Sequence, residues 1–449
     1  MKITMIGAGY VGLVSGACFA DIGHDVICVD RDETKLEALR RGEIPIYEPG
    51  LETIVHANVR ADRLRFSSDL AAAVGDADAV FIAVGTPSRS GDGLADLTYV
   101  YAVARDLAPS LKDHTVVVTK STVPVGTGDE IERIIHKANP AADVAVASNP
   151  EFLREGSAIG DFMHPDRIVI GTDDARARVV MHDIYAPLDT DHDRILMMGR
   201  RTAELTKYAG NSFLAMKVTF INEIADLCEK VGADVLDVAR GIGMDERIGR
   251  KFLHAGPGIG GSCFPKDTLA LVKTAHDADS PVRLVETTVT VNDQRKRAMA
   301  KKIIRACEGS VRGKTVGILG LTFKPDTDDI RESPALPIIT ALQDAGARIR
   351  AYDPEGMDHA KSMLRNVTFC DDAYDAADNA DALVIVTEWN LFRNLDLARL
   401  KRVMASPVMV DLRNVYDPAT VHAAGLRHTG VGRGNGKDEM SLVLYQAAE

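Results

Sequence analysis

The stretch from Gly256 to Asp267, GPGIGGSCFPKD, carries the residue types of a nucleophilic site. Cys263 follows two glycines and Ser262, so the backbone before it can turn tightly and let another molecule approach closely. Lys266 and Asp267 come directly afterwards, and a cation and a carboxylate beside a thiol can favour the thiolate or manage its protons. The alternative is a structural role, because free cysteines are among the most buried residues of folded proteins. The motif indicates covalent chemistry at Cys263, with a buried structural thiol as the competing interpretation.

The composition is that of an ordinary globular chain. Its 449 residues are enough for about three domains, each with its own core. Hydrophobic residues make up 46% and charged residues 26% of the sequence, as in many soluble proteins. The net charge of -12 argues against nucleic acid as a partner, because phosphate backbones are bound by basic surfaces. An anionic small molecule remains compatible with this charge where cations gather locally.

The cysteines are dispersed and include no C-x-x-C pair, so neither a zinc site nor a disulfide framework is indicated, and we expect no bound metal. A reducing compartment fits this usage. The N-terminus has a strand and a glycine loop where a signal peptide would need an apolar core, and no apolar run reaches membrane-spanning length. We therefore expect a cytoplasmic protein without a membrane partner. The six cysteines are Cys18, Cys28, Cys228, Cys263, Cys307 and Cys370.

The N-terminal sequence has the order of a dinucleotide fold. An apolar run at 3–6 is followed by Gly7-Ala-Gly9-Tyr-Val-Gly12, a helical pattern to Ala20, a second apolar run at 26–29, and Asp30. Gly7 makes the turn, Gly9 admits a pyrophosphate to the helix N-terminus, and Gly12 lets helix and strand pack. Asp30 can accept hydrogen bonds from ribose hydroxyls, which favours NAD over NADP. Arg31 is the counterargument, because an arginine here could face a 2′-phosphate.

Polar residues follow three further strands of this predicted sheet. Apolar runs at 79–84 and 115–119 lead to Thr86 and Thr122, at the edge where open parallel sheets bind ligands. These threonines can meet a cofactor or a catalytic water, although helix capping is an equal alternative for either. A run at 145–147 leads to Glu151 and Glu155, which share a face if the segment forms a helical turn. A solvated surface turn is the other interpretation.

A long helix is predicted from about Thr202 to Lys230, with Glu204 in its first turn. Glu204, Lys207 and Asn211 form a polar stripe beside apolar residues. Such a stripe usually faces solvent. A helix of this length must cross the molecule, so we expect a connector between two α/β domains that also dimerises.

Arg247, Arg250 and Lys251 form a basic cluster just before the cysteine motif. They are candidates for a phosphate site, and ordinary surface charge is an equally good interpretation.

A second α/β unit is predicted after residue 312. Strands are expected at 316–319, 347–352, 382–386 and 408–412, with a helix at 333–345, Lys324 after the first strand and Arg413 after the last. The unit lacks a full glycine fingerprint, so it should hold a nucleotide-like ligand other than NAD. The predicted fold class is α/β, with two doubly wound Rossmann-like domains joined by a long central helix and a helical dimerisation segment. The expected domains are 1–200, 201–300 and 312–449.

The chain resembles the UDP-glucose/GDP-mannose dehydrogenase family over nearly its whole length. The resemblance is carried by GAGYVG, STVPVGT, NPEFLREG, AELTKYAGN, DERIG, FLHAGPGIGGSCFPKD and GLTFKPDTDDIRESPA. It implies an NAD domain, a central dimerisation segment and a C-terminal domain that holds a UDP moiety. It also implies four-electron oxidation of a sugar C6 alcohol to a carboxylate, with two NAD and one water.

The residues make chemical sense of that reaction. Lys207, or a water held by Asp267, can remove the hydroxyl proton as the first hydride leaves. Cys263 can then capture the aldehyde as a thiohemiacetal, which a second oxidation converts to a thioester. Lys207 and Asn211 can stabilise charge on the sugar oxygen. Water positioned by Thr122 and activated by Glu151 or Asp267 would hydrolyse the thioester.

The resemblance also implies two sets of contacts. The cofactor set is Gly7, Gly9, Val11, Gly12, Asp30, Lys35, Thr86, Thr122, Glu155, Lys266 and Arg331. The substrate set is Glu151, Phe152, Leu153, Arg154, Lys207, Asn211, Arg247, Phe252, Leu253, Gly256, Gly260, Lys324 and Arg413, with Arg247 reaching a neighbouring subunit in a homodimer.

With its phenylalanine, the motif GGSCFPKD resembles that of the family members that act on UDP-glucose, so UDP-glucose is the expected substrate. UDP-glucuronate for polysaccharide synthesis is the expected product. Relatives acting on GDP-mannose or UDP-N-acetylmannosamine share the chemistry and remain alternatives. A catalytically silent nucleotide-sugar sensor is a different class of alternative. The presence of Cys263, Lys207, Asn211 and Asp267 together argues against a sensor, which would not need a nucleophile.

Overall fold

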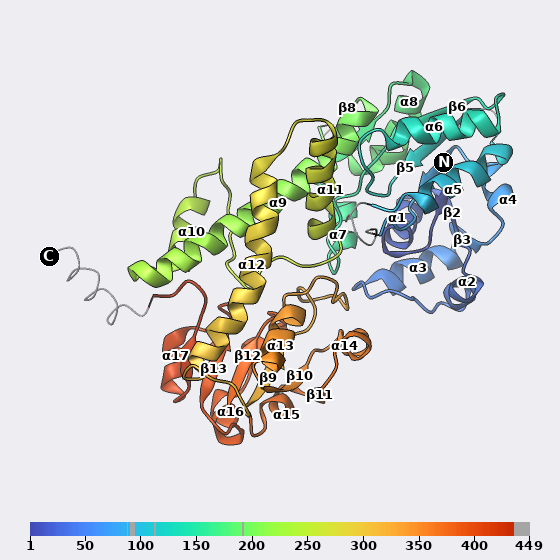
Figure 1. The fold of residues 1–449 in the computed structure, drawn as a ribbon. Coiled ribbons are helices and arrows are strands. Elements are labelled where there is room, and N and C mark those ends of the chain that lie inside the picture. Colours follow the sequence, from blue (N-terminus) through green and yellow to red (C-terminus); the bar gives the residue numbers. More distant parts are fainter. Residues whose placement is uncertain (88, 90–94, 112–113, 191–192, 435–449) are drawn as a thin grey trace. The chain divides into compact units, whose positions relative to one another are not determined.

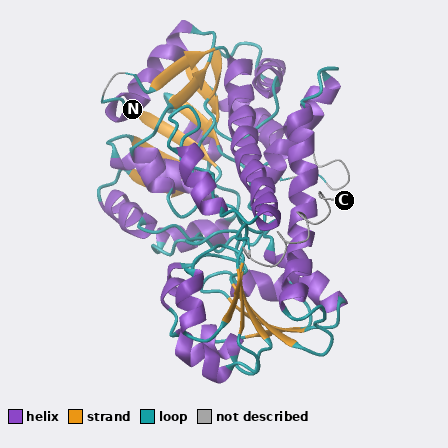
Figure 2. Cartoon of the chain, turned by 90° about the vertical axis from the view of Figure 1, so that its left-hand side faces the viewer, coloured by secondary structure: helices purple, strands orange, loops and turns teal. Residues whose placement is uncertain are grey.

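The computed structural model describes residues 1–87, 89, 95–111, 114–190 and 193–434, so the end of the predicted C-terminal domain, 435–449, lies outside the described residues. The chain forms two compact units. The first contains residues 1–210 and 270–280, and the second contains residues 211–269 and those from 281 onward. Each unit is built on one sheet with helices against it (Figure 1 and Figure 2). The predicted α/β class is confirmed.

The sheet of the first unit has eight strands in the order β3-β2-β1-β4-β5-β6-β7-β8. The first six are parallel, and β7 pairs antiparallel with β6 and parallel with β8. The strand order reverses between β1 and β4, which is where doubly wound sheets bind ligands. The strands are β1 Lys2–Ile6, β2 Asp25–Val29, β3 Leu64–Ser67, β4 Ala79–Ile82, β5 Thr115–Thr119, β6 Val144–Ser148, β7 Ile168–Gly171 and β8 Ile195–Met198.

Helices of this unit often begin at an aspartate that accepts backbone N–H groups of the first turn, as at Asp32, Asp69 and Asp174. Two apolar clusters pack around the central strands, one including Phe19 and Phe81 and the other including Ile82. The helices are α1 Tyr10–Asp21, α2 Glu33–Arg40, α3 Leu51–Arg60, α4 Leu70–Val74, α5 Thr98–Leu107, α6 Thr127–Ala138, α7 Ala158–Met163 and α8 Ala175–Tyr185, with 3₁₀ turns η1 Ala108–Ser110 and η2 Ala186–Leu188.

The sheet of the second unit has six parallel strands in the order β11-β10-β9-β12-β13-β14. This order repeats that of the first six strands in the first unit, so the predicted second doubly wound sheet is confirmed. The strands are β9 Thr315–Leu319, β10 Arg348–Tyr352, β11 Val367–Phe369, β12 Ala382–Ile385, β13 Val408–Asp411 and β14 Arg427–Thr429.

One core of the second unit joins the sheet to the central helices, since Ile221 and Leu253 belong to the same cluster as Ile303 and Val316. A second cluster around Phe392 lies on the other side of the strands. The helices of this unit are α10 Val235–Gly243, α12 Arg283–Ala306, α13 Ala335–Asp344, α14 Met357–Met363, α15 Ala373–Ala377, α16 Leu397–Val403 and α17 Pro418–Ala423, with the 3₁₀ turn η3 Asn390–Asn394. Helix α11 runs from Phe264 to Asp277 and begins directly after the cysteine.

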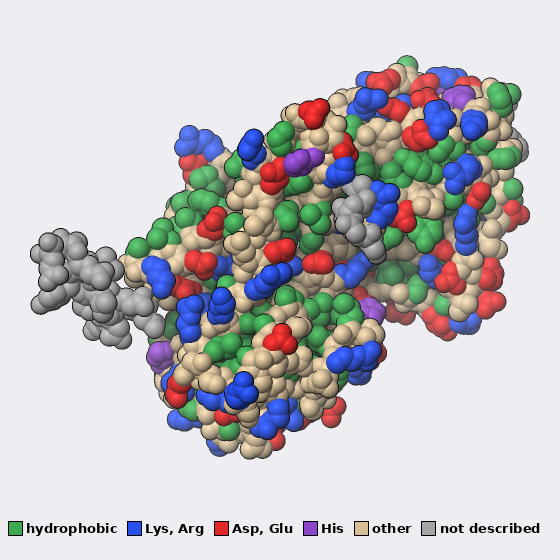
Figure 3. Space-filling view, in the orientation of Figure 1, with side chains coloured by type: hydrophobic (Ala, Val, Ile, Leu, Met, Phe, Trp, Pro, Cys, Tyr) green, Lys and Arg blue, Asp and Glu red, His purple; other side chains and the backbone are tan. Residues whose placement is uncertain are grey.

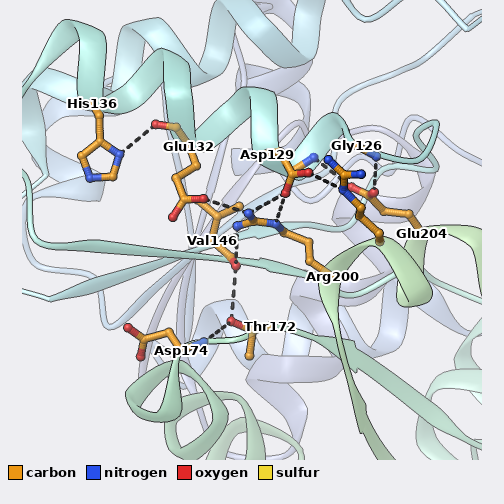
Figure 4. Close-up of polar contacts among 11 residues, drawn as sticks. Gly126, Asp129, Glu132, His136, Val146, Thr172, Asp174, Arg200 and Glu204 are labelled. Atoms are coloured by element: carbon orange, nitrogen blue, oxygen red, sulfur yellow. Dashed lines mark hydrogen bonds and ion pairs between the residues drawn. The ribbon is translucent and has the colours of Figure 1, made fainter.

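The long predicted helix is α9, Arg200–Val231, and its first turns are anchored to α6 (Figure 4). The Arg200 guanidinium donates to Asp129 at 2.6 Å and to Glu132 at 2.8 Å. Glu204 accepts from the backbone of Gly126 and Gly128 at 2.6 and 2.8 Å. The expectation that Glu204 lies in the first turn of this helix is wrong, because α9 begins at Arg200, and the Glu204 carboxylate caps α6 instead.

Within the described part of the chain, no helix has the length and apolar character needed to cross a membrane. The same residues include no cluster of three or more His, Cys, Asp or Glu side chains able to hold a metal ion.

Candidate active site

The glycine loop after β1 has the geometry its sequence predicts. Gly7 has φ +103°, a conformation that side chains rarely adopt. A Cβ on Gly12 would lie 1.8 Å from the Gly7 carbonyl oxygen, so only glycine lets α1 pack this closely. A Cβ on Gly9 would meet nothing within 4 Å. The loop therefore opens toward free space at Gly9, at the N-terminus of α1 that Val11 helps to form, and helix N-termini of this kind favour anions.

Asp30 ends β2 and faces this loop. Its carboxylate accepts from the Ala8 backbone at 2.8 Å and forms an ion pair with Lys35 at 3.0 Å. Burial acts to raise the pKa of Asp30, but the backbone N–H groups of Asp32 and Ala8 and the Lys35 ammonium outweigh it and lower the pKa. Asp30 is thus held ionised, as acceptance of ribose hydroxyls requires. The exposed Arg31 forms an ion pair with Asp106.

A buried carboxylate links the glycine loop to the segment after β6, and the sequence analysis missed it. Glu48 accepts from the backbone of Gly156 at 2.6 Å and of Ala158 at 2.8 Å. The Tyr10 hydroxyl of α1 donates to the same carboxylate. Burial, together with that hydrogen bond, raises the pKa of Tyr10. No motif marks Glu48, which lies in an irregular stretch between α2 and α3.

The two strand-end threonines lie together. The Thr86 hydroxyl donates to the Thr122 carbonyl at 3.1 Å. Neither residue caps a helix, since α5 begins at Thr98 and α6 at Thr127. Both lie in loops at the carboxyl edge of the sheet, beside the strand-order reversal.

The segment from Glu151 to Glu155 is not a helical turn, so the condition for a shared face of the two carboxylates is not met. The Glu151 carboxylate folds back and accepts from the Leu153 backbone at 2.5 Å, which replaces helical bonding with a local turn. Glu151 is buried and Glu155 is half-buried. Arg154 is exposed and forms an ion pair with Asp161.

Lys207 of α9 reaches this turn. Its Nζ lies 3.4 Å from Glu151 Oε1 and 5.2 Å from the centroid of the Phe152 ring. The Arg167 guanidinium lies 3.8 Å from the same ring centroid. Lys207 and Glu151 are 3% and 6% exposed, so the interpretation of the polar stripe as a solvated face is wrong. Lys207 and Asn211 of α9 point inward because each contacts a buried carboxylate, Glu151 and Asp267 respectively.

Cys263 differs from the other cysteines of the chain. It is partly exposed, whereas the other five are buried. Burial raises the pKa of the Cys18 and Cys28 thiols to about 12, which makes them inert. Cys263 precedes the first residue of α11, where the helix dipole favours negative charge on sulfur. Its Sγ lies 3.6 Å from the Ser262 hydroxyl.

Asp267 lies one turn beyond the thiol and is fully buried. One carboxylate oxygen accepts from the Asn211 amide at 2.6 Å, and the other accepts from Lys266 at 2.7 Å. Asn211 is four residues after Lys207 on α9, so the two side chains share a helix face. Asn211 and Lys266 are therefore both in direct contact with Asp267.

The loop before Cys263 is held by side chains that the sequence analysis did not identify. Asn222 of α9 accepts from the Gly256 backbone N–H at 2.8 Å, and Arg295 of α12 donates to the Gly256 carbonyl at 2.7 Å. The Asn292 amide accepts from Ile259 N–H at 2.7 Å and donates to Ile259 O at 3.2 Å. Both polar backbone groups of Gly256 and of Ile259 are thus bound by buried side chains.

The same loop packs on the segment after β9. Gly261 donates to the Arg331 carbonyl at 2.9 Å, and a Cβ on Gly260 would lie 2.6 Å from the Glu332 carbonyl oxygen. Phe252, Asp326 and Glu332 adopt positive φ without being glycine, at +64°, +60° and +53°. Such strain often gathers at functional sites.

Arg413 connects these loops within the second unit. It donates to the Phe323 carbonyl at 3.0 Å and forms an ion pair with Glu388 at 3.0 Å, and its guanidinium lies near Gly256. Lys324 lies 5.8 Å from the Phe323 ring centroid. The predicted contacts Leu253, Gly256, Gly260, Lys324 and Arg413 therefore belong to neighbouring loops of one unit.

The basic cluster is not a gathered cation site among the residues described. Arg247 pairs with Asp245, two residues before it, and its side chain is largely exposed. Arg250 and Lys251 are also exposed. The interpretation as surface charge fits all three, and a contact of Arg247 with a second subunit stays a prediction.

Three family models match the chain. They describe the NAD binding domain of the UDP-glucose/GDP-mannose dehydrogenase family at residues 1–189, its central domain at 201–294 and its UDP binding domain at 317–418.

Individual proteins are also similar over almost the full length. A UDP-glucose 6-dehydrogenase of Rhizobium meliloti (strain 1021) is 66% identical over 96% of this chain and 100% of its own. The structure of a UDP-glucose dehydrogenase from Pyrobaculum islandicum has a TM-score of 0.88 and 39% identity, over 96% of this chain and 97% of its own. A UDP-D-ManNAc dehydrogenase from Pyrococcus horikoshii has a TM-score of 0.85 and 25% identity, over 97% and 100%.

Proposed function

The chain belongs to the UDP-glucose/GDP-mannose dehydrogenase family, and we propose that it oxidises UDP-glucose to UDP-glucuronate with NAD in two steps. The observation that carries the proposal is the arrangement around the cysteine. A partly exposed thiol at the start of α11 stands one turn from a buried carboxylate that contacts Asn211. A single alcohol oxidation would not need such a nucleophile.

NAD would be held by the first unit. Gly7, Gly9 and Gly12 provide the turn, the open approach and the close packing, and Asp30 with Lys35 provides the ribose site. Thr86, Thr122 and Glu155 are further proposed contacts from this unit. The resemblance to the family is the ground for Lys266 and Arg331 in the proposed set. Bound NAD would accept a hydride in each oxidation.

The first oxidation needs a base at the C6 hydroxyl. Lys207 is one candidate, because it is buried and its proton can pass to the neighbouring Glu151. A water held by Asp267 is the other. Removal of the hydroxyl proton accompanies loss of the hydride and leaves an aldehyde. The Lys207 ammonium and the Asn211 amide would stabilise negative charge on this oxygen as the hydroxyl loses its proton and when the thiol adds to the aldehyde.

The second oxidation uses Cys263. Its sulfur adds to the aldehyde carbon and forms a thiohemiacetal, and loss of a second hydride from that carbon gives a thioester. Water near Thr122, activated by Glu151 or Asp267, attacks the acyl carbon. The C–S bond breaks, the carboxylate leaves, and the thiol regains its proton. The aldehyde never leaves the site.

Two groups of residues are the proposed substrate contacts, the loops around Arg413 and the turn after Glu151. Phe252, Leu253, Gly256, Gly260 and Lys324 contribute from the former, and Phe152, Leu153 and Arg154 from the latter. UDP-glucose is favoured over GDP-mannose and UDP-N-acetylmannosamine, because the 66% identical relative is a UDP-glucose 6-dehydrogenase and the UDP-D-ManNAc enzyme is 25% identical.

We also propose that α9 mediates a homodimer. Phe213, Phe220 and Leu227 are spaced by seven residues on this helix and are each at least half exposed. Hydrophobic side chains also cover the neighbouring surface over α10 (Figure 3). A second copy of the helix would bury this stripe, and Arg247 would contact the partner's substrate. A mass measurement by light scattering tests the dimer, with Phe220→Glu as the disrupting variant.

The reduced cysteine required by this chemistry favours the cytoplasm, and polysaccharide synthesis is the proposed destination of the product. The three-domain division at 1–200, 201–300 and 312–449 stays our prediction.

The activity is tested with a panel of UDP-glucose, GDP-mannose and UDP-N-acetylmannosamine, following NADH by absorbance. Two NADH per UDP-glucose are expected. One NADH per sugar with free aldehyde would disprove the thioester route, and preference for another sugar would reassign the substrate.

A further inference from the structure

Lys120 is a buried cation for which the proposed reaction has no role. It is the first residue after β5 and is 4% exposed. Its Nζ donates to Asn149 Oδ1 and to the Tyr185 hydroxyl, each at 3.0 Å. Within the described part of the chain it forms no ion pair with a carboxylate. Buried ammonium groups without such a partner are rare, because removing the charge from water is costly.

The immediate surroundings of Lys120 are neutral and well ordered by hydrogen bonds. The Tyr185 hydroxyl also donates to Asn149 at 2.5 Å, and Asn149 Nδ2 donates to the Val169 carbonyl at 2.8 Å. The Tyr185 and Phe162 rings lie 5.6 and 5.9 Å from the ammonium. These contacts fix the ammonium in place without neutralising it, so its charge remains available to other groups.

The charges that act on Lys120 belong to the site itself, namely Glu151 and Lys207. Asn149 is two residues before Glu151, whose Oε1 lies 3.4 Å from Lys207 Nζ. This part of the unit thus buries two cations and one anion, the side chains of Lys120, Lys207 and Glu151. The Arg167 guanidinium also lies on this side, against the Phe152 ring that Lys207 faces.

We propose that Lys120 is a positioning residue of the reaction, whose buried ammonium holds Asn149 ahead of Glu151 and opposes the positive charge of Lys207. The inference rests on the proposed function. A carboxylate 3.4 Å away alone would keep Lys207 protonated. The second cation offsets part of that attraction and so favours the neutral amine that a base requires.

The electrostatics of Lys120 support this assignment. Burial lowers the pKa of Lys120 to about 8, while the Glu151 charge raises it and the Lys207 charge lowers it. Repulsion between two ammonium groups is mutual, so a charged Lys120 also disfavours the charged form of Lys207. Lys120 is still protonated at pH 7, where this repulsion is needed.

The test compares the pH dependence of kcat/KM for UDP-glucose in the wild type and three variants. Lys120→Gln keeps a donor toward Asn149 but removes the charge. The limb of the pH profile that corresponds to deprotonation of Lys207 should then move up by about one pH unit. At pH 7 kcat should then fall about tenfold with little change in KM. Lys120→Arg keeps the charge and should keep the wild-type limb. Tyr185→Phe is the matched control, because it removes one contact of Lys120 and leaves the charge.

Two further measurements cover other outcomes. If Lys120→Gln does not fold, Asn149→Asp neutralises Lys120 in place by an ion pair and should shift the limb in the same direction. The Lys207 titration is also followed by NMR of lysine-labelled protein, with Lys207→Gln for assignment, and it needs no turnover. The inference is overturned if folded Lys120→Gln shows the wild-type pH profile and the wild-type Lys207 titration. It is also overturned if Tyr185→Phe shifts the pH profile as much as Lys120→Gln does. NADH formation by the wild type would leave the proposed function standing in either case. Absence of wild-type turnover defeats the proposed function, and the NMR titration then decides the charge coupling.

Discussion

Asn211 of α9 donates its amide to Asp267 of α11 across 2.6 Å. Asp267 is fully buried, and its other oxygen is bound by Lys266. Because Cys263 lies one turn before Asp267, this contact ties the helix that carries Lys207 to the helix that begins at the nucleophile.

Replacing Asp267 by asparagine keeps the shape of the side chain and removes its charge. Lys266 then loses its ionic partner, and residue 267 can no longer hold or activate water as a carboxylate. We expect kcat to fall about 100-fold or more, as for loss of a general acid or base. Asp277→Asn is the matched control, since that residue is exposed on the same helix and should retain activity. Equal activity of both variants would remove Asp267 from the mechanism.

Cys263 variants separate covalent from noncovalent functions. Cys263→Ala should lose net turnover by orders of magnitude yet still bind NAD and UDP-glucose, because neither the glycine loop nor the loops around Arg413 are altered. Cys263→Ser should stall after capture or the first oxidation, since an oxygen ester is a poorer acyl donor than a thioester. Mass spectrometry of the serine variant should detect a sugar adduct at residue 263. Cys370→Ala, at a buried thiol, serves as control; near-normal turnover in Cys263→Ala would make the thiol structural.

Asp30 should make the enzyme prefer NAD, because a carboxylate held ionised repels a 2′-phosphate. The ratio of kcat/KM for NAD over NADP should be large in the wild type and should fall at least tenfold in Asp30→Ala. Arg31→Ala should leave the ratio unchanged, since the Arg31 guanidinium pairs with Asp106. Equal kcat/KM for both cofactors in the wild type would show that the end of β2 does not select the cofactor.

Lys120 should also make stability depend on pH. Its pKa is lowered from 10.5 to about 8 in the folded chain, so between these values the unfolded chain binds more protons. The free energy of unfolding should therefore rise as pH increases from 8 to 10.5. This added stability should be lost again as pH falls back to 8. The rise is of the order of 3 kcal/mol. Urea unfolding with reductant should show this increment in the wild type and its loss in Lys120→Gln. Parallel curves for the two proteins would contradict it.

Much of the first unit could be predicted from local sequence. The glycine spacing, the apolar runs and Asp30 are all short-range signals, and the loop takes the conformation they require at Gly7. The second sheet was also predictable, because its strands are apolar runs separated by helical segments. Cys263 and Asp267 were found because they share one motif.

The remaining site residues depend on contacts that spacing cannot report. The stripe of Glu204 and Lys207 matches a solvated face in period and polarity, and only the partners Gly126 and Glu151 show that it is buried. A helical turn from Glu151 to Glu155 was one of two interpretations, and the bond from the Leu153 backbone N–H to the Glu151 carboxylate excludes it. Asn292 is 33 residues from Ile259, in an amphipathic helix where an asparagine gives no signal.

Asn292 provides the last prediction. Its amide satisfies both polar backbone groups of Ile259 within a buried part of the loop that leads to Cys263. Asn292→Ala leaves a buried N–H and C=O without these partners, which costs about 1–3 kcal/mol for each such group. The loop should then sample other conformations, so KM for UDP-glucose should rise about tenfold and kcat should fall.

Two companion variants make the interpretation specific. Asn292→Asp can still accept from Ile259 N–H but cannot donate to its carbonyl, so its kcat/KM should lie between those of the wild type and the alanine variant. Gln294→Ala, at an exposed position of α12, should behave as the wild type. NAD binding, measured by calorimetry, should be unchanged in all three, because the glycine loop lies far from residue 292 in sequence and in another unit. A loss of NAD binding equal to the loss of UDP-glucose binding would mean that Asn292→Ala disturbs the whole chain rather than the loop.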